Sequence, residues 1–373
     1  MFKKKGKKGV VEVQFNWIFV MIAGGLILFF FTTIISGQKA TSEKKLNTDL
    51  VNQFELIFAG QGVATGTKNQ IDLPPVPLQF GCSDYAIGEQ AKTLGNAVVF
   101  SPAVIDSKKM LTSTLAWQVP FKVSNFVYLT APNVKYYFVD FSPDIQQIIT
   151  GGMPLGDEYY QFLNRIDYED IVYERNPTVK FIFNMFGGAD IPTRLPESFF
   201  DVSDEQVRAV ALEGEGYLAT SRDFTPTLRL KFYKKEGTGW VPDTEGLQGD
   251  AFSVLKFETF LGAVFAGNAE LFQCNMRRAL LRLKYVANVY DQKLNLLVGN
   301  QKYNCILSTD DDDATIGDPC CEIFQTTEFS EMSGLIQPNG MLEANRDLEL
   351  TRLETLLQGK NENAMRGSCP TLY

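Results

Sequence analysis

The chain has no histidine among its 373 residues. This excludes Ser-His-Asp triads, Cys-His nucleophile pairs and imidazole general bases. Zinc sites that need histidine are excluded too, and no two cysteines follow the C-x-x-C spacing. There is also no N-x-[ST] sequon for N-glycosylation. Most enzyme classes are thereby removed, so we expect a structural or binding protein rather than an enzyme, with no cofactor and no catalytic residue.

Charge is absent from one long stretch, residues 15–36, which reads FNWIFVMIAGGLILFFFTTIIS. As a helix these 22 residues would measure about 33 Å, enough to cross a hydrocarbon core of about 30 Å. Five lysines precede the stretch, and lysines flanking a span stay on the cytoplasmic side. We therefore predict a basic cytoplasmic tail at 1–14 and a transmembrane helix at 15–36 in the lipid bilayer of the cytoplasmic membrane. The rest of the chain should lie outside.

The net charge of −9 is unevenly distributed along the chain. Residues 1–36 carry five lysines and one glutamate, whereas the remaining residues carry 30 basic and 43 acidic side chains. A surface with that excess of acid repels nucleic acid, so no nucleic-acid partner is expected. The partners to expect are the bilayer, other proteins or further copies of the chain.

Past the apolar stretch, residues 37–77 read as a stalk helix followed by a proline-rich linker. Apolar residues recur every three or four positions up to residue 58, and Pro74-Pro75-Val76-Pro77 follows. This helix could serve as a stalk or as an assembly surface, and packing on the ectodomain is the interpretation that we favour.

Residues 78–262 predict an α/β ectodomain, a mixed sheet with flanking helices. Short runs rich in Val, Ile, Phe and Tyr are bounded by Pro, Gly or Asn. The predicted strands are 78–82, 97–100, 126–130, 134–140, 179–184, 206–212 and 228–233. Only three residues separate the third and fourth of these strands, which favours an antiparallel hairpin between them.

Residues 263–373 predict a helical, cysteine-rich C-terminal region. The best helix is 276–297, whose apolar residues recur at alternating steps of four and three and indicate core packing, with a partner helix as the alternative. A second helix is predicted at 345–358.

All six cysteines follow the predicted span, where an oxidising compartment would permit disulfides. They are Cys82, Cys274, Cys305, Cys320, Cys321 and Cys369. Adjacent Cys320 and Cys321 are expected to reach different partners, and one bridge is expected to reach back to Cys82. Reduced thiols and a metal site are the alternatives.

The strongest concentration of charge is the aspartate run at 310–313. Asp310, Asp312 and Asp318 are weak candidates for Ca²⁺ ligands, because Ca²⁺ prefers carboxylate oxygens. Calcium loops space their ligands at alternate positions around a glycine, and this run does not. An exposed acidic loop is the simpler interpretation. No spacing of other acidic residues points to a hydrolase, which we keep as a second alternative function.

The N-terminus, with Lys7-Lys8-Gly9 before VVEVQFNWIFV, resembles the prepilin-type signals of type IV pilin-like proteins, particularly archaeal ones. The resemblance implies cleavage after Gly9 and retention of the apolar helix as anchor and assembly core. Glu12 lies third after Gly9, whereas bacterial pilins place the glutamate fifth after the cut. The chain is also longer than most pilins.

Taken together, the features resemble a group of uncharacterised archaeal single-pass membrane proteins. They are the KKG…QFNWIFV anchor, a mixed ectodomain, the segment CNMRRA (residues 274–279) and the final SCPTLY. The resemblance implies an anchor and structural cysteines but no activity. We therefore expect a membrane-anchored extracytoplasmic structural or interaction protein. The alternative is a pilin-like subunit that is processed after Gly9.

Overall fold

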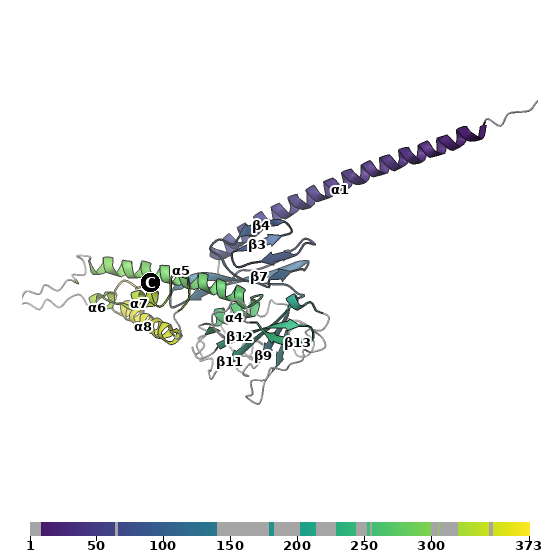
Figure 1. Cartoon of the computed structure of the whole chain (residues 1–373). Helices are drawn as coiled ribbons and strands as arrows, with labels where there is room; N and C mark the ends of the chain where they lie inside the picture. Colours follow the sequence, from purple (N-terminus) through teal and green to yellow (C-terminus); the bar gives the residue numbers. More distant parts are fainter. Residues whose placement is uncertain are drawn as a thin grey trace, which may run out of the picture.

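The computed structural model describes residues 9–63, 66–139, 179–182, 202–213, 229–243, 252–253, 256–299, 305, 320–342 and 346–373. Within these residues a long N-terminal helix leads to three β-sheets, and the C-terminal helices extend from the sheets on the opposite side (Figure 1). The mixed α/β content agrees with the sequence prediction. The single mixed sheet that we expected is instead three sheets.

Helix α1 runs without a break over Gly9–Val63, so the predicted span and most of the predicted stalk form one element. No proline occurs in these residues, and nothing therefore interrupts the backbone hydrogen-bond ladder. At 1.5 Å per residue the helix is about 80 Å long. Its first part stands clear of the sheets and its last turns pack on them (Figure 1).

The first sheet has the strand order β1-β7-β8-β5. Strands β1 (Lys68–Asp72), β7 (Lys109–Gln118) and β8 (Lys122–Thr130) are antiparallel, and β5 (Val98–Phe100) runs parallel to β8. After Lys122 every residue of β8 is buried. Such two-sided burial indicates that other elements cover both faces of this sheet.

The second sheet has the order β4-β3-β2-β6 and packs beside the end of α1. Its strands are β2 (Leu78–Phe80), β3 (Asp84–Ile87), β4 (Gln90–Thr93) and β6 (Val104–Ile105), all antiparallel. A two-residue turn joins β3 to β4, and its first residue, Gly88, has φ +59°, a conformation that favours glycine.

The third sheet has the order β10-β9-β11-β12-β13, with β14 also paired to β12. Strand β9 (Lys135–Val139) is parallel to both β10 (Val179–Ile182) and β11 (Val207–Glu213). Strands β12 (Arg229–Glu236), β13 (Gly239–Pro242) and β14 (Phe252–Ser253) add antiparallel pairs, and a short 3₁₀ helix, η3 (Asp204–Gln206), precedes β11.

The hairpin that we predicted between residues 126–130 and 134–140 is wrong. Strand β8 pairs on its two sides with β7 and β5, so both of its edges are occupied. Strand β9 therefore leaves for the third sheet, and Val134 N donates to Ala131 O in the connecting turn. A short link permits a hairpin but does not require one when the first strand has no free edge.

Two helices, α4 (Phe257–Phe265) and α5 (Ala269–Val298), pack against the first sheet. Phe100 stacks with Tyr128 and packs against Phe272 of α5. A Cβ atom on Gly262 would lie 2.8 Å from the Phe100 ring, so glycine allows α4 to approach the sheet closely. Apolar burial between these layers forms the core of the folded part.

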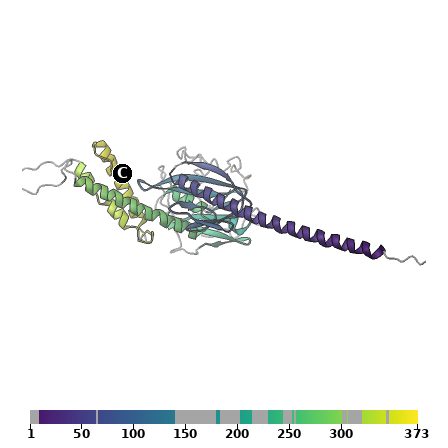
Figure 2. The ribbon, with the colours of Figure 1, turned by 90° about the horizontal axis from the view of Figure 1, so that it is seen from above.

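Helix α5 continues beyond the sheets into an arm that contains three further helices, of which the first two pack against α5 and the last packs on those two. These are α6 (Cys320–Phe324), α7 (Glu328–Gly334) and α8 (Asp347–Arg366). Figures 1 and 2 both show this helical arm extending away from the start of α1. The apolar face predicted at 276–297 is confirmed as core packing, since Leu283, Ala287 and Leu294 are buried.

Candidate functional site

The apolar half of α1 is the largest exposed apolar surface in the described residues. Trp17–Gln38 has a mean hydropathy of 2.6 and is long and apolar enough to cross a membrane. Its large side chains face solvent, with exposed fractions of 69% for Trp17, 73% for Phe19 and 71% for Phe29. Contiguous exposed apolar area of this kind marks a surface that contacts lipid or other proteins.

The hydroxyl groups in this half of α1 form hydrogen bonds within the helix. The Thr32 hydroxyl donates to Leu28 O at 3.0 Å, and the Thr33 hydroxyl donates to Phe29 O at 2.8 Å. The Ser36 hydroxyl bonds to Thr32 O in the same way. Because an unsatisfied polar group is costly in hydrocarbon, these back-bonds make the helix compatible with a lipid environment.

The last turns of α1 are attached to the second sheet by an aromatic cluster. Val51, Phe54 and Phe58 recur on one face and are at least 95% buried. Both Phe54 and Phe58 pack edge-on against Tyr85 of β3, with ring centroids 6.2 and 5.3 Å apart. This contact explains why the sequence shows apolar spacing up to residue 58, and it agrees with packing rather than a free stalk.

Polar contacts surround the aromatic cluster. The Tyr85 hydroxyl donates to Val51 O at 2.8 Å, and Lys92 forms an ion pair with Glu55 beside its 3.1 Å bond to Asn52 Oδ1. Burial, together with the nearby Glu55 carboxylate, raises the pKa of Tyr85 to about 12. The neutral phenol is therefore fixed as a donor to the backbone of α1.

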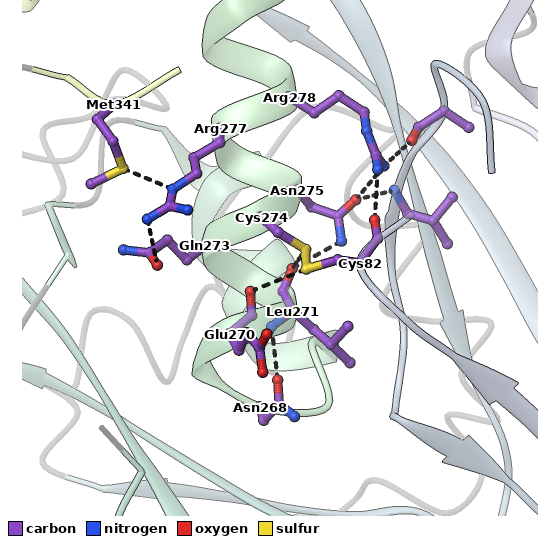
Figure 3. The surroundings of a disulfide bond; sticks show 12 residues. Cys82, Asn268, Glu270, Leu271, Gln273, Cys274, Asn275, Arg277, Arg278 and Met341 are labelled. Carbon is purple, nitrogen blue, oxygen red and sulfur yellow. Dashed lines mark hydrogen bonds between the residues drawn. A yellow bond between two sulfur atoms is a disulfide. The ribbon is translucent and has the colours of Figure 1, made fainter. Parts of the chain in front are cut away.

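A second joint, around the disulfide Cys82–Cys274, attaches α5 to the sheets (Figure 3). Arg278 donates to Cys82 O at 2.6 Å and to Ala97 O at 2.7 Å. Asn275, which is 1% exposed, accepts the Val99 amide at 3.1 Å. Strand β5 lies at a sheet edge, so Asn275 gives a partner to a backbone donor that would otherwise remain unpaired.

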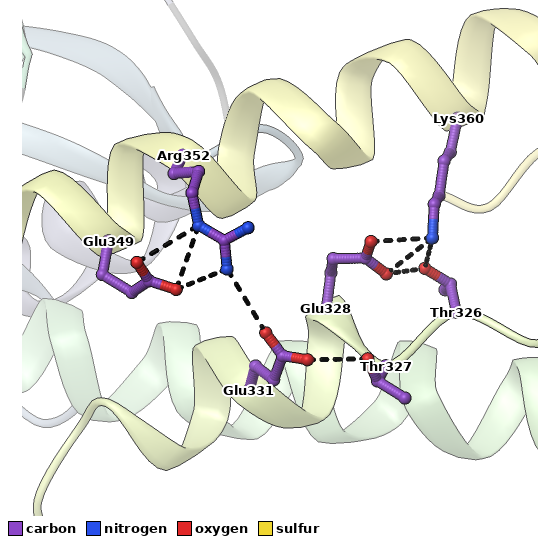
Figure 4. Close-up of polar contacts among 7 residues, drawn as sticks. All are labelled: Thr326, Thr327, Glu328, Glu331, Glu349, Arg352 and Lys360. Atoms are coloured by element: carbon purple, nitrogen blue, oxygen red, sulfur yellow. Dashed lines mark hydrogen bonds and ion pairs between the residues drawn. The ribbon is translucent and has the colours of Figure 1, made fainter.

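The other two disulfides hold the segments of the helical arm together. Ion pairs between α7 and α8 add to them (Figure 4). Cys305 pairs with Cys321, and Cys320 pairs with Cys369. Arg352 bonds Glu349 at 2.5 Å and lies 3.7 Å from Glu331. Lys360 binds both Glu328, at 2.7 Å, and Thr326, at 2.8 Å. These contacts fix α8 against α7.

A cavity of about 380 Å³ opens between the end of α1, strand β8 and α5. Buried Phe58, Leu94 and Val127 line it together with exposed Glu55 and Arg282. The only acid that lines it, Glu55, is paired with Lys92, so the described lining offers shape and charge but no acid–base pair.

The predicted site residues are placed as follows. All six cysteines form disulfides, adjacent Cys320 and Cys321 reach different partners, and Cys82 is reached by a C-terminal cysteine, which is consistent with the sequence analysis. Asp310, Asp312 and Asp318 lie outside the described residues. Gly9 is the first residue of α1. In the described residues no group of three or more Cys, Asp or Glu side chains could hold a metal ion.

Sequence reasoning missed Tyr85 and the roles of Asn275 and Arg278. The segment CNMRRA contains the latter two residues, and its resemblance to a recurring pattern was the one signal that pointed to them. Nothing around Tyr85 in the sequence indicates that its hydroxyl contacts a helix more than 30 residues earlier.

Comparison of the chain with protein-family models, with curated proteins and with solved structures finds no match. The function must therefore be argued from the geometry of the anchor helix and its attachment.

Proposed function

We propose that this chain is a single-pass membrane protein that holds a disulfide-linked α/β domain outside the cytoplasmic membrane, as a structural or interaction module. The observation that carries the proposal is the division of α1. One unbroken helix exposes its apolar 22-residue segment and buries Val51, Phe54 and Phe58 against the sheets. An anchor that is continuous with the domain fixes both the height and the orientation of that domain.

The height follows from the helix geometry. Val51, the first buried side chain described in α1, lies thirteen positions after Gln38, the end of the apolar segment. At 1.5 Å per residue the sheets would stand about 20 Å beyond the apolar segment. Three disulfides and the lysines before the span support placement of this domain outside.

The test is the topology of the full chain in its native membrane. Carbonate at high pH should leave the protein in the membrane pellet, and protease added to intact cells should degrade the domain. Recovery of the protein in the carbonate supernatant, or degradation of the domain only after the membrane is opened, would contradict the proposal.

A second candidate is a pilin-like subunit processed after Gly9. The exposure of the apolar half of α1 favours it, because that surface is available to the helices of neighbouring subunits as well as to lipid. This function requires a shortened N-terminus and a high-mass assembly. N-terminal sequencing of the native protein separates the two candidates, since the anchored module keeps residues 1–9.

A further inference from the structure

Exposed large apolar side chains are unevenly distributed over the described residues. Outside α1 every one of them lies on α5 or α8: Tyr285, Val289, Leu296, Leu348, Leu356 and Met365. At 100° per residue the three on α8 spread over about half of that helix. The three on α5 fall within about 40° of one another. Among the described residues outside α1, exposed apolar side chains therefore form a stripe on α5 alone.

The stripe on α5 has the spacing of a coiled-coil seam. Its positions are Arg282, Tyr285, Val289, Gln292 and Leu296, at alternating steps of three and four. Tyr285, Val289 and Leu296 are 65%, 62% and 77% exposed. The opposite side of the helix forms the core of the arm, so this side is a second apolar face beyond what the monomer's packing needs.

We propose that this face of α5, residues 282–296, pairs with the same face of a second copy in the same membrane. The inference rests on the proposed anchoring. Two copies with their α1 helices in one membrane share an orientation, so a symmetric pair has its two-fold axis along the membrane normal. Figures 1 and 2 both show α5 leading away from the start of α1. In both copies α5 therefore points away from the membrane, and the two α5 helices run in the same direction.

A parallel pair places identical residues opposite one another. Tyr285, Val289 and Leu296 form apolar layers, and β-branched valine at an a position suits two-stranded pairing. Gln292 faces its counterpart, where paired amides can bond each other and fix the register. No acidic residue lies on the face, and its one charge, Arg282, is at the end next to the cavity that Glu55 also lines. Like charges therefore do not oppose pairing along its centre.

The size of the face determines where pairing occurs. Three apolar side chains per copy fall well short of the roughly 800 Å² per partner of a standard stable interface. Tethering both copies to one membrane raises their effective concentration and restricts their orientation. The pair should accordingly form in the membrane and dissociate when detergent disperses the chains.

The test is disulfide crosslinking of the full-length chain in intact membranes. The variant Val289→Cys is compared with Leu348→Cys, whose position on α8 is equally exposed at 63%. Mild oxidation should convert most of the Val289→Cys chain to a species of about twice 41.8 kDa. We expect at least tenfold less of this species from Leu348→Cys. Adding Leu296→Asp to Val289→Cys should reduce the yield at least tenfold, because the new carboxylates face each other.

Carbonate extraction of the same samples separates the pairing from the anchoring. A chain that stays in the membrane pellet but crosslinks no better at 289 than at 348 overturns the pairing alone. A crosslinked product of any other mass identifies a different partner and overturns it as well. A chain that carbonate releases overturns the anchoring, and with it the pairing of tethered copies, whatever its yield of crosslink at 289.

Discussion

At the scale of single residues, the buried ion pair Lys256–Glu354 joins the start of α4 to α8. The ammonium and carboxylate are 2.6 Å apart, and both side chains are about nine-tenths buried. Removing one charge from such a pair leaves the other in a low-dielectric site. We predict that Glu354→Gln lowers the free energy of unfolding by about 3–5 kcal/mol. Thermal unfolding of the purified chain measures this change.

The matched control is Glu362→Gln, which removes an acid from the exposed pair Glu362–Arg366 on the same helix. Exposed ion pairs contribute little, so its unfolding should be indistinguishable from that of the wild type. Equal effects of the two variants would mean that the Lys256–Glu354 pair is not buried as described.

Ionisation of Tyr85 makes the free energy of unfolding depend on pH at high pH. Its pKa of about 12 in the folded chain exceeds the usual value of 10, so the unfolded chain loses this proton first. The free energy of unfolding should therefore be unaffected below about pH 10 and should fall as pH rises from 10 to 12. Tyr85→Phe removes this part of the fall and one hydrogen bond, worth about 1 kcal/mol at neutral pH.

Unfolding curves from pH 8 to 12 test this prediction, with Tyr285→Phe as control because the Tyr285 side chain is 65% exposed. A Tyr85→Phe chain that loses stability at high pH as steeply as the wild type would show that this phenol does not resist ionisation in the folded chain.

At the scale of elements, the attachment of α1 depends on its buried aromatic face. We predict that Phe54→Ala lowers the free energy of unfolding by about 3–5 kcal/mol, since the ring is 1% exposed and the cavity cannot close fully. Loosening α1 should also speed tryptic cleavage at Lys44 and Lys45. Leu56→Ala, at a side chain 73% exposed on the same turn, should change neither measurement. Equal sensitivity of both positions would argue against the packed face.

Some elements could be predicted because their residues follow one dominant period. The core face of α5 does so, whereas the apolar stretch of α1 is recognised by 22 residues without a charge, and both are confirmed as helices. Strand β7 could not be predicted. Its Thr112, Ser113 and Thr114 are all buried, so the sequence shows polar residues where a strand would normally show alternation. Burial of these hydroxyls is set by neighbours on both faces, which no local pattern encodes.

Pairing between elements was less predictable than the elements themselves. The three-residue link after β8 suggested a hairpin, and only the occupation of both β8 edges explains why none forms. The joint around Asn275 could not be predicted for a similar reason. The Asn275 side chain bonds Val99, 176 residues earlier in the chain, so its role follows from the tertiary fold.

At the scale of the whole molecule, the parts lie in a line from anchor to sheets to helical arm (Figure 2). One disulfide closes the sheets onto α5 across 192 residues, and the other two close the arm. Crosslinking so long a loop restricts the unfolded chain, by about 5 kcal/mol on a chain-entropy estimate. Under the proposed anchoring by α1, this arrangement presents the arm away from the membrane.

The measurement that tests the anchored, disulfide-linked chain most directly is its intact mass after purification from the native membrane and alkylation without reduction. We predict the mass of all 373 residues with no alkyl group added. Loss of residues 1–9 with no alkyl group would instead support the pilin-like subunit. Addition of six alkyl groups would contradict the account, because the three disulfides would be absent and placement of the domain outside would rest on the lysines alone.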